Sequence, residues 1–269
     1  MIGFIVMITS NKLSMKFSKY TNRQISDYWN LRLQPSPWAF AIWAVIYALM
    51  FTFTVYQSLP DSMVDRHNSL IFGQIKHTFW VSCLLNAGWL FIFQQNTFSG
   101  FLISTFVIIL MWLSTFKMMH LSTTHHLNVI EFISMRIGFS LYCGWLTIAT
   151  VLNTLLAFES SKKHFNGIDD DSYQKYSESE ESISSTISTI ALYFALAIYM
   201  LVVTAMKNPV YGLAFLWALR AIQARQKQYT QFIKQIEIVR RIFRIYMLSF
   251  WGFLIYEKVH GSITNGILY

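Results

Sequence analysis

Long stretches without a formal charge constrain this chain more than any other feature of its sequence. No Asp, Glu, Lys or Arg occurs between Arg32 and Asp61, and the next such stretch runs from Lys76 to Lys117. About 20 apolar residues in a helix cross the ~30 Å hydrocarbon core of a bilayer. Only 13% of the residues are charged, against about 25% in soluble domains. We therefore expect an all-α, multi-pass membrane protein, and the composition argues against a soluble enzyme or a secreted, disulfide-stapled domain.

The uncharged stretches predict five spans and two shorter candidates. The stretch after Lys76 is too long for one helix, and the polar segment QQNTFSG within it predicts a hairpin of two spans. The two short candidates require Arg220 and Arg244 to snorkel to the membrane interface. In chain order, the predicted spans are 35–59, 78–93, 101–116, 137–158 and 183–206, followed by the short candidates 208–219 and 245–256.

Positive charge is distributed unevenly over the loops of a seven-span topology. The side of the N-terminus receives 15 of the 21 Lys and Arg residues, so the positive-inside rule places the N-terminus on the cytosolic or matrix side. The chain then divides into a basic N-terminal tail (1–34), a core of four spans (35–158), an acidic Ser-rich loop (159–182), additional spans (183–225), and a basic amphipathic stretch with the last candidate span (226–269).

The acidic loop and the basic stretch lie on the same predicted side. Residues 159–181 hold seven acids and three bases, a composition typical of a solvated loop. Residues 220–244 hold seven bases and one acid, with apolar residues near helical spacing. This stretch could contact the acidic loop or acidic lipid headgroups, and the sequence leaves both alternatives open.

Three predicted spans each place aromatic or amide side chains on one face. In the first span, Phe40, Trp43 and Tyr47 follow i, i+3, i+7 spacing. The corresponding faces of the second and fourth spans hold Ser82, Asn86, Trp89 and Phe93, and Tyr142, Trp145, Ala149 and Asn153. One interpretation is helix packing, with the two asparagines hydrogen-bonded across helices. The other is an aromatic cavity that takes a flat or elongated apolar ligand.

Sequence signals of catalysis are missing. The chain has no Gly-rich phosphate loop, no HExxH and no GxSxG motif, and no carboxylate lies inside the five longer spans. Cys83 and Cys143 fall in apolar runs, as inert core thiols do. The histidines fall in loops without other ligands at metal-binding spacing. We therefore expect a protein that is not an enzyme and has no metal site. Its basic charges lie between apolar runs, which argues against nucleic acid as a partner.

Three segments resemble motifs of the TspO/MBR family, the tryptophan-rich sensory proteins that include the mitochondrial translocator protein. They are PSPWAFAIWAVIY at 35–47, LLNAGWLFIF at 84–93 and SLYCGWLTIATVLN at 140–153. A longer branch of the family is matched by Ile25-Ser26-Asp27 before the first motif and Trp217-Ala218-Leu219 after the last. The resemblance covers roughly residues 11–225. It implies a TspO-like five-helix core with extra C-terminal helices.

The family binds porphyrins, sterols and synthetic aromatic ligands in a cavity within its bundle. The resemblance therefore implies a porphyrin, haem or lipid ligand, with no cofactor required. The Tyr/Arg pattern that the family uses for sterols is replaced here by residues 154–158, TLLAF, which puts sterol binding in doubt. Spacing and resemblance together give the cavity candidates Trp38, Phe40, Trp43, Tyr47, Asn86, Trp89, Trp145, Ala149 and Asn153.

Two functions fit these features. The sequence favours an accessory subunit of a larger organellar assembly, of respiratory type in the mitochondrial inner membrane, whose partners are the lipid bilayer and other membrane subunits. The basic amphipathic stretch, the short last spans and the altered sterol motif favour it. The alternative is a stand-alone membrane receptor or transport-related protein that binds a porphyrin, a sterol or another apolar aromatic ligand in the aromatic cavity.

Overall fold

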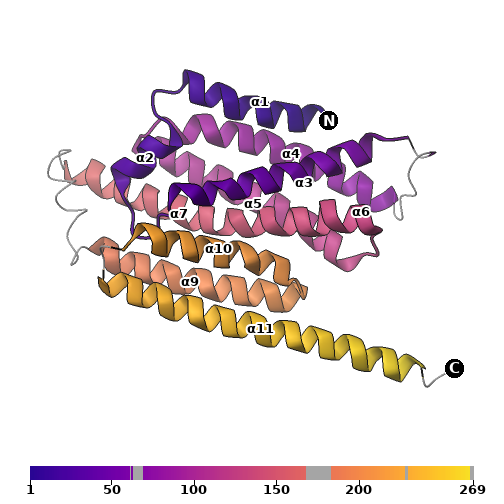
Figure 1. The fold of residues 1–269 in the computed structure, drawn as a ribbon. Coiled ribbons are helices and arrows are strands. Elements are labelled where there is room, and N and C mark those ends of the chain that lie inside the picture. Colours follow the sequence, from indigo (N-terminus) through magenta and orange to yellow (C-terminus); the bar gives the residue numbers. More distant parts are fainter. Residues whose placement is uncertain (61, 63–68, 168–182, 228–229, 267–269) are drawn as a thin grey trace.

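The computed structural model describes residues 1–60, 62, 69–167, 183–227 and 230–266, and in these residues the chain is almost entirely helical, without a strand (Figure 1). The elements are α1 (Ile2–Phe17), α2 (Asn22–Trp29), the 3-10 helix η1 (Pro37–Ala41), α3 (Ile42–Ser58), α4 (Ser69–Phe93), α5 (Phe98–Thr124), α6 (Val129–Glu131), the π-helical turn η2 (Phe132–Ile137), α7 (Gly138–Asn166), α9 (Ile183–Met206), α10 (Pro209–Arg225) and α11 (Thr230–Gly266).

Within the described residues, four helical segments are long and apolar enough to cross a membrane, which confirms the expected all-α, multi-pass fold. They are Pro37–Ser58, Phe98–Thr124, Val129–Asn166 and Thr186–Met206. These correspond to the first, third, fourth and fifth predicted spans. The remaining predicted spans lie in α4, α10 and α11, which fall outside this set.

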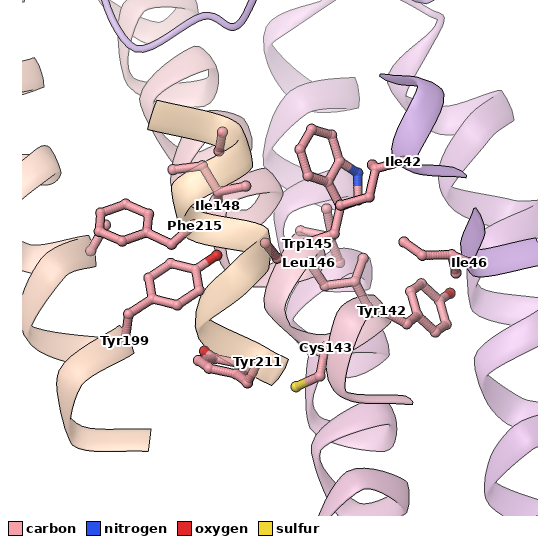
Figure 2. Packing of buried hydrophobic residues seen from close by; sticks show 14 of the residues in the cluster. Ile42, Ile46, Tyr142, Cys143, Trp145, Leu146, Ile148, Tyr199, Tyr211 and Phe215 are labelled. Atoms are coloured by element: carbon pink, nitrogen blue, oxygen red, sulfur yellow. The ribbon is translucent and has the colours of Figure 1, made fainter. Parts of the chain in front are cut away.

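Helix α7 lies at the centre of the bundle and packs against α3, α5, α9 and α10. In the most apolar part of its span 61% of the residues are buried, against 33% for the span that contains α3. Figure 2 shows two buried aromatic side chains of α7, Tyr142 and Trp145, directed toward α3. The opposite side of α7 meets an aromatic cluster from α9 and α10, formed by Tyr199, Tyr211 and Phe215.

Residues 1–34 form two packed helices rather than the expected tail. One face of α1 packs against α4, where Met7 is fully buried, while Ile2, Ile5 and Phe17 are exposed. Asn11 Nδ2 donates to the hydroxyl of Tyr47 at 3.2 Å. The segment is too short to span a bilayer but long enough to cover one side of the bundle. Helix α2 begins with a capping box formed by Thr21 and Gln24.

Helix α7 also extends farther than the sequence predicts. We expected the span to end at Phe158, but the helix continues to Asn166 and ends at Gly167, whose φ of +60° suits glycine. Glu159, the first residue of the expected loop, is buried in this helix and pairs with Lys162 at 3.5 Å. The expected acidic loop therefore begins later, and its residues 168–182 lie outside the described part of the chain.

Helices α9, α10 and α11 form a layer on one side of the bundle (Figure 1). Helix α11 runs beside α9, where Tyr193 donates to Gln235 at 2.8 Å and the Tyr246 hydroxyl donates to the carbonyl of Met200 at 2.9 Å. Arg244, two residues before Tyr246, therefore lies near the level of Met200 in the second half of α9. The helix that contains the predicted span 245–256 begins at Thr230, so the part of α11 beside α9 starts before this stretch.

Candidate ligand-binding site

A cavity of about 380 Å³ lies between α3, α4, α5 and α7 and is covered by residues of α1 and α2. Seven of the nine predicted residues line it: Phe40, Trp43, Tyr47, Asn86, Trp89, Trp145 and Ala149. Its volume falls in the range of about 300–1,000 Å³ that is usual for small-molecule sites. The side chains that share a face on three helices in the sequence therefore meet at one cavity.

The wall from α3 is aromatic because η1 and α3 present one continuous face. Pro35 and Pro37 restrict the backbone at the entry to η1, and both line the cavity. Phe40 meets Trp145 edge to face at 6.0 Å between ring centroids. Trp43 lies 5.7 Å from the ring of Tyr142, which is buried behind the cavity wall.

Asn86 lines the cavity and has one side-chain atom bonded and one without a partner in the described part of the chain. Its Nδ2 donates to the Tyr142 hydroxyl at 3.5 Å, and Ser82 Oγ donates to the same hydroxyl at 3.5 Å. The Oδ1 atom of Asn86 is buried and has no hydrogen-bond partner. A buried acceptor without a partner is unfavourable by about 1–3 kcal/mol. This unpaired acceptor belongs to a residue that lines the cavity.

Asn153 serves helix packing and does not line the main cavity. Its Oδ1 accepts the indole N–H of Trp89 at 3.0 Å, and its Nδ2 donates to Ser104 at 2.9 Å and to Thr105 at 2.8 Å. It lines a small neighbouring cavity of about 90 Å³ that shares Trp89 and Ala149 with the main one. For Asn153, the packing interpretation of the sequence is the one that the contacts favour.

Trp38 was predicted to line the cavity, and the structure places it elsewhere. Its ring packs edge to face on Trp217 of α10 at 5.0 Å. Trp217 also donates its indole N–H to the carbonyl oxygen of Ala39 at 2.9 Å. The physical reason is the 3-10 geometry of η1. With three residues per turn, Pro37 and Phe40 share one side, and Trp38 points away from it.

Residues of α1 and α2 that sequence reasoning missed complete the lining: Asn11, Asn22, Arg23 and Ser26. Helix α2 is tied to the bundle by Trp29, whose indole N–H donates to Asn96 at 2.8 Å. Asn22 Oδ1 accepts from Gln94 at 2.8 Å, and Arg225 of α10 pairs with Asp27 at 3.0 Å. The segment Ile25-Ser26-Asp27 was a signal for this cover, but neither spacing nor resemblance places it at the cavity.

Comparison with known protein families shows which family the chain belongs to. A family model described as TSPO-like protein matches residues 1–251. The chain belongs to the family of TSPO-like proteins. No curated protein and no solved structure matched it. Family membership and the four apolar helices together make it a multi-pass integral membrane protein.

In this TSPO-like protein, the segments singled out by resemblance lie close together. The first motif and α10 are joined by the amide of Ser36, which donates to the carbonyl of Ala221 at 3.0 Å. Cys83 and Cys143 are buried, free thiols. Among the described residues, no group of three His, Cys, Asp or Glu side chains is placed to hold a metal ion.

Proposed function

We propose that this TSPO-like protein binds a flat or elongated apolar ligand that carries a hydrogen-bond donor. The observation that carries the proposal is the unpaired Oδ1 of Asn86 in a cavity walled by Phe40, Trp43, Trp89 and Trp145. Aromatic rings supply apolar contact, and one polar group fixes the ligand's orientation, as is common in such sites. The proposed activity is binding, without a catalysed reaction.

Porphyrins and sterols both satisfy these requirements. A porphyrin has a flat ring with peripheral carboxylic acid groups, whose O–H can donate when it is protonated, and a sterol has one hydroxyl on an elongated apolar body. Arg23, one of the residues that cover the cavity, adds a cation that suits a carboxylate of the ligand. This charge favours a porphyrin with acidic side chains over a neutral sterol.

Titration with protoporphyrin IX, followed by quenching of tryptophan fluorescence in detergent, tests the proposal. Asn86→Leu keeps the volume but removes the acceptor, so we expect affinity to fall about threefold to tenfold, the value of one hydrogen bond. Ser82→Ala is the matched control, because Ser82 also donates to Tyr142 but does not line the cavity. Equal affinities of wild type and Asn86→Leu would contradict the proposal.

The second candidate is an accessory subunit of a respiratory-type assembly in the mitochondrial inner membrane. In this proposal, the end of the bundle that carries α2 and Lys163 faces the matrix. The supporting observation is α11, a 37-residue helix that packs mainly against α9 and α10. It leaves large apolar side chains exposed, among them Ile245, Leu248, Trp251 and Phe253.

Native gel electrophoresis after extraction in mild detergent tests the second candidate. Migration of the chain with a much larger assembly from its own membranes supports a subunit role. A small, monodisperse particle that binds protoporphyrin IX would contradict the subunit role and support ligand binding as the function.

A further inference from the structure

A polar hollow of about 570 Å³ lies at the end of the bundle that carries α2 (Figure 1). Its wall combines α2, the connection between α4 and α5, and the last turns of α7, and includes Gln24, Tyr28, Asn96, Phe98, Lys163 and His164. Among the described residues, none lines both this hollow and the aromatic cavity. The ligand proposed for the aromatic cavity therefore does not account for the hollow.

Phe98 fixes the depth of the hollow in the membrane. It begins the candidate span Phe98–Thr124, and its ring stacks on the imidazole of His164 at 5.5 Å between centroids. From Phe98 to Lys117 this span carries no charge over about 28 Å, close to the ~30 Å thickness of the hydrocarbon core. Leu102, one turn farther along α5, is exposed, as lipid-facing residues are. The hollow therefore lies where the hydrocarbon core meets the lipid headgroups.

The wall of the hollow offers hydrogen-bond donors. Lys163 Nζ donates to the hydroxyl of Tyr28. Asn96 Oδ1 accepts the indole N–H of Trp29 at 2.8 Å, and Gln24 Oε1 accepts a backbone amide at 2.9 Å in the capping box of α2. Because the oxygen atoms of both side-chain amides bind protein, their nitrogen atoms are the groups that suit a ligand, and these only donate. A ligand for this hollow therefore brings acceptor oxygens.

The charges around the hollow favour a negative ligand. No Asp or Glu in the described part of the chain lines it. Glu159, which lies on α7 beside the lining residues, is buried and pairs with Lys162 at 3.5 Å. The Lys163 ammonium lies 4.9 Å from the ring of Tyr28 and 5.9 Å from that of Trp29. A cation over these rings takes the place where a choline group would bind, so the aromatic wall does not favour a zwitterionic choline headgroup.

We propose that this hollow binds the phosphate of an anionic phospholipid at the level where α5 enters the hydrocarbon core. The ammonium of Lys163 and a ring N–H of His164 bind the phosphate oxygens. The amide nitrogens of Asn96 and Gln24 bind the remaining oxygens of the headgroup. Basic pockets between membrane helices hold anionic headgroups in this way. The site is separate from the aromatic cavity, and the inference does not rest on ligand binding there.

Native mass spectrometry of the full chain in detergent tests the site. The probes are dioleoylphosphatidylglycerol, which is anionic, and dioleoylphosphatidylcholine, which is zwitterionic, and wild type should bind the first at least about tenfold more tightly. Lys163→Gln removes the charge but keeps a donor for Tyr28, so affinity for phosphatidylglycerol should fall about fivefold to tenfold. Lys163→Arg keeps the charge and should stay within about twofold of wild type. Lys117→Gln is the matched control, because Lys117 is an exposed lysine near the opposite end of α5.

Three results would overturn the proposal. The first is equal affinity of wild type and Lys163→Gln for phosphatidylglycerol, or equal affinity of wild type for the two lipids. The second is displacement of the lipid by glycerol 3-phosphate at equal concentration, which would make the hollow a site for soluble phosphates. The third is a wild type that retains no phosphatidylglycerol beside a D169N/D170N/D171N variant that does, which would mean that the chain's own acids fill the hollow.

Photo-cross-linking locates the lipid on wild type, so it tests the site even where Lys163→Gln fails to fold. The probe is a phosphatidylglycerol that carries a diazirine on the acyl chain next to the glycerol. We expect adducts on residues 94–102 and 158–166, and we expect excess unlabelled phosphatidylglycerol, but not phosphatidylcholine, to remove them. Adducts confined to other parts of the chain would contradict the proposed site.

Discussion

The indole N–H of Trp89 donates to Asn153 Oδ1 at 3.0 Å and joins α4 to α7 beside the cavity. The amide nitrogen of Asn153 extends the link to α5 through Ser104 and Thr105. The buried side-chain amide of Asn153 therefore links three helices, α4, α5 and α7, by hydrogen bonds. Single hydrogen bonds between membrane helices contribute about 0.6 kcal/mol on average, and one at the upper end about 1.7 kcal/mol.

Asn153→Ala should reduce the free energy of unfolding by about 1–2 kcal/mol, since it breaks several bonds and leaves the Trp89 indole without its acceptor. Thermal unfolding in detergent measures it. Thr52→Ala is a suitable control, because the Thr52 hydroxyl is exposed and donates only to the carbonyl of Ala48 in its own helix. Equal stability of the two variants would show that the amide links contribute nothing.

Helical spacing predicted most of the cavity wall because α3, α4 and α7 are regular there. Phe40, Trp43 and Tyr47 share a face by i, i+3, i+7 spacing and do line one cavity. Trp38 was a candidate through the family resemblance and not through spacing, and in the 3-10 helix Pro37–Ala41 it packs on Trp217 instead. Neighbouring prolines restrict the backbone there, and the sequence did not show which tight turn they would produce.

Gly144 lies at a close contact between α7 and α10. A Cβ at this position would be 2.5 Å from the carbonyl oxygen of Tyr211, a backbone atom that moves only with its helix. Gly144→Ala should therefore destabilise the protein by about 1–3 kcal/mol through overpacking. Gly88→Ala is the control, because its Cβ would meet nothing within 4 Å and alanine favours the helix by about 0.5–1 kcal/mol. Thermal midpoints that shift in the same direction would contradict this account of the contact.

Trp43 and Trp38 offer a test of which face of the first motif contacts the ligand. Trp43 lines the cavity, whereas Trp38 packs on Trp217. Trp43→Leu should weaken protoporphyrin IX binding about tenfold, since it removes a large aromatic contact. Trp38→Leu should leave the affinity within about twofold. Equilibrium titration by porphyrin absorbance avoids the loss of a tryptophan signal. The reverse order of the two effects would place the ligand between η1 and α10.

The sequence alone could not predict that α1 and α2 cover the cavity, or how far α11 is shifted along α9. Both depend on contacts between distant parts of the chain, such as Arg225 with Asp27 and Tyr246 with Thr204. Hydrophobic periodicity describes each helix alone and says nothing about its shift along a neighbour. The uncharged stretch 245–256 therefore marked only part of α11, which already runs beside α9 at Gln235.

The ion pair between Asp27 and Arg225 predicts how ligand exchange is controlled. It ties α2, which covers the cavity, to α10, and Arg225 also donates to Ser26 Oγ at 3.3 Å. Asp27 is more than half exposed, so the pair contributes less than about 1 kcal/mol to overall stability. Its loss should instead let α2 open more often.

We expect Asp27→Asn to release protoporphyrin IX about twofold to tenfold faster in stopped-flow displacement, with little change in thermal midpoint. Raising the salt concentration should speed release from wild type in the same way, because screening weakens an exposed pair. Glu257→Gln is the matched control: it breaks the exposed pair with Lys207, which joins the end of α9 to α11 away from α2. If release from Asp27→Asn and Glu257→Gln is equally fast, opening of α2 does not limit ligand exchange.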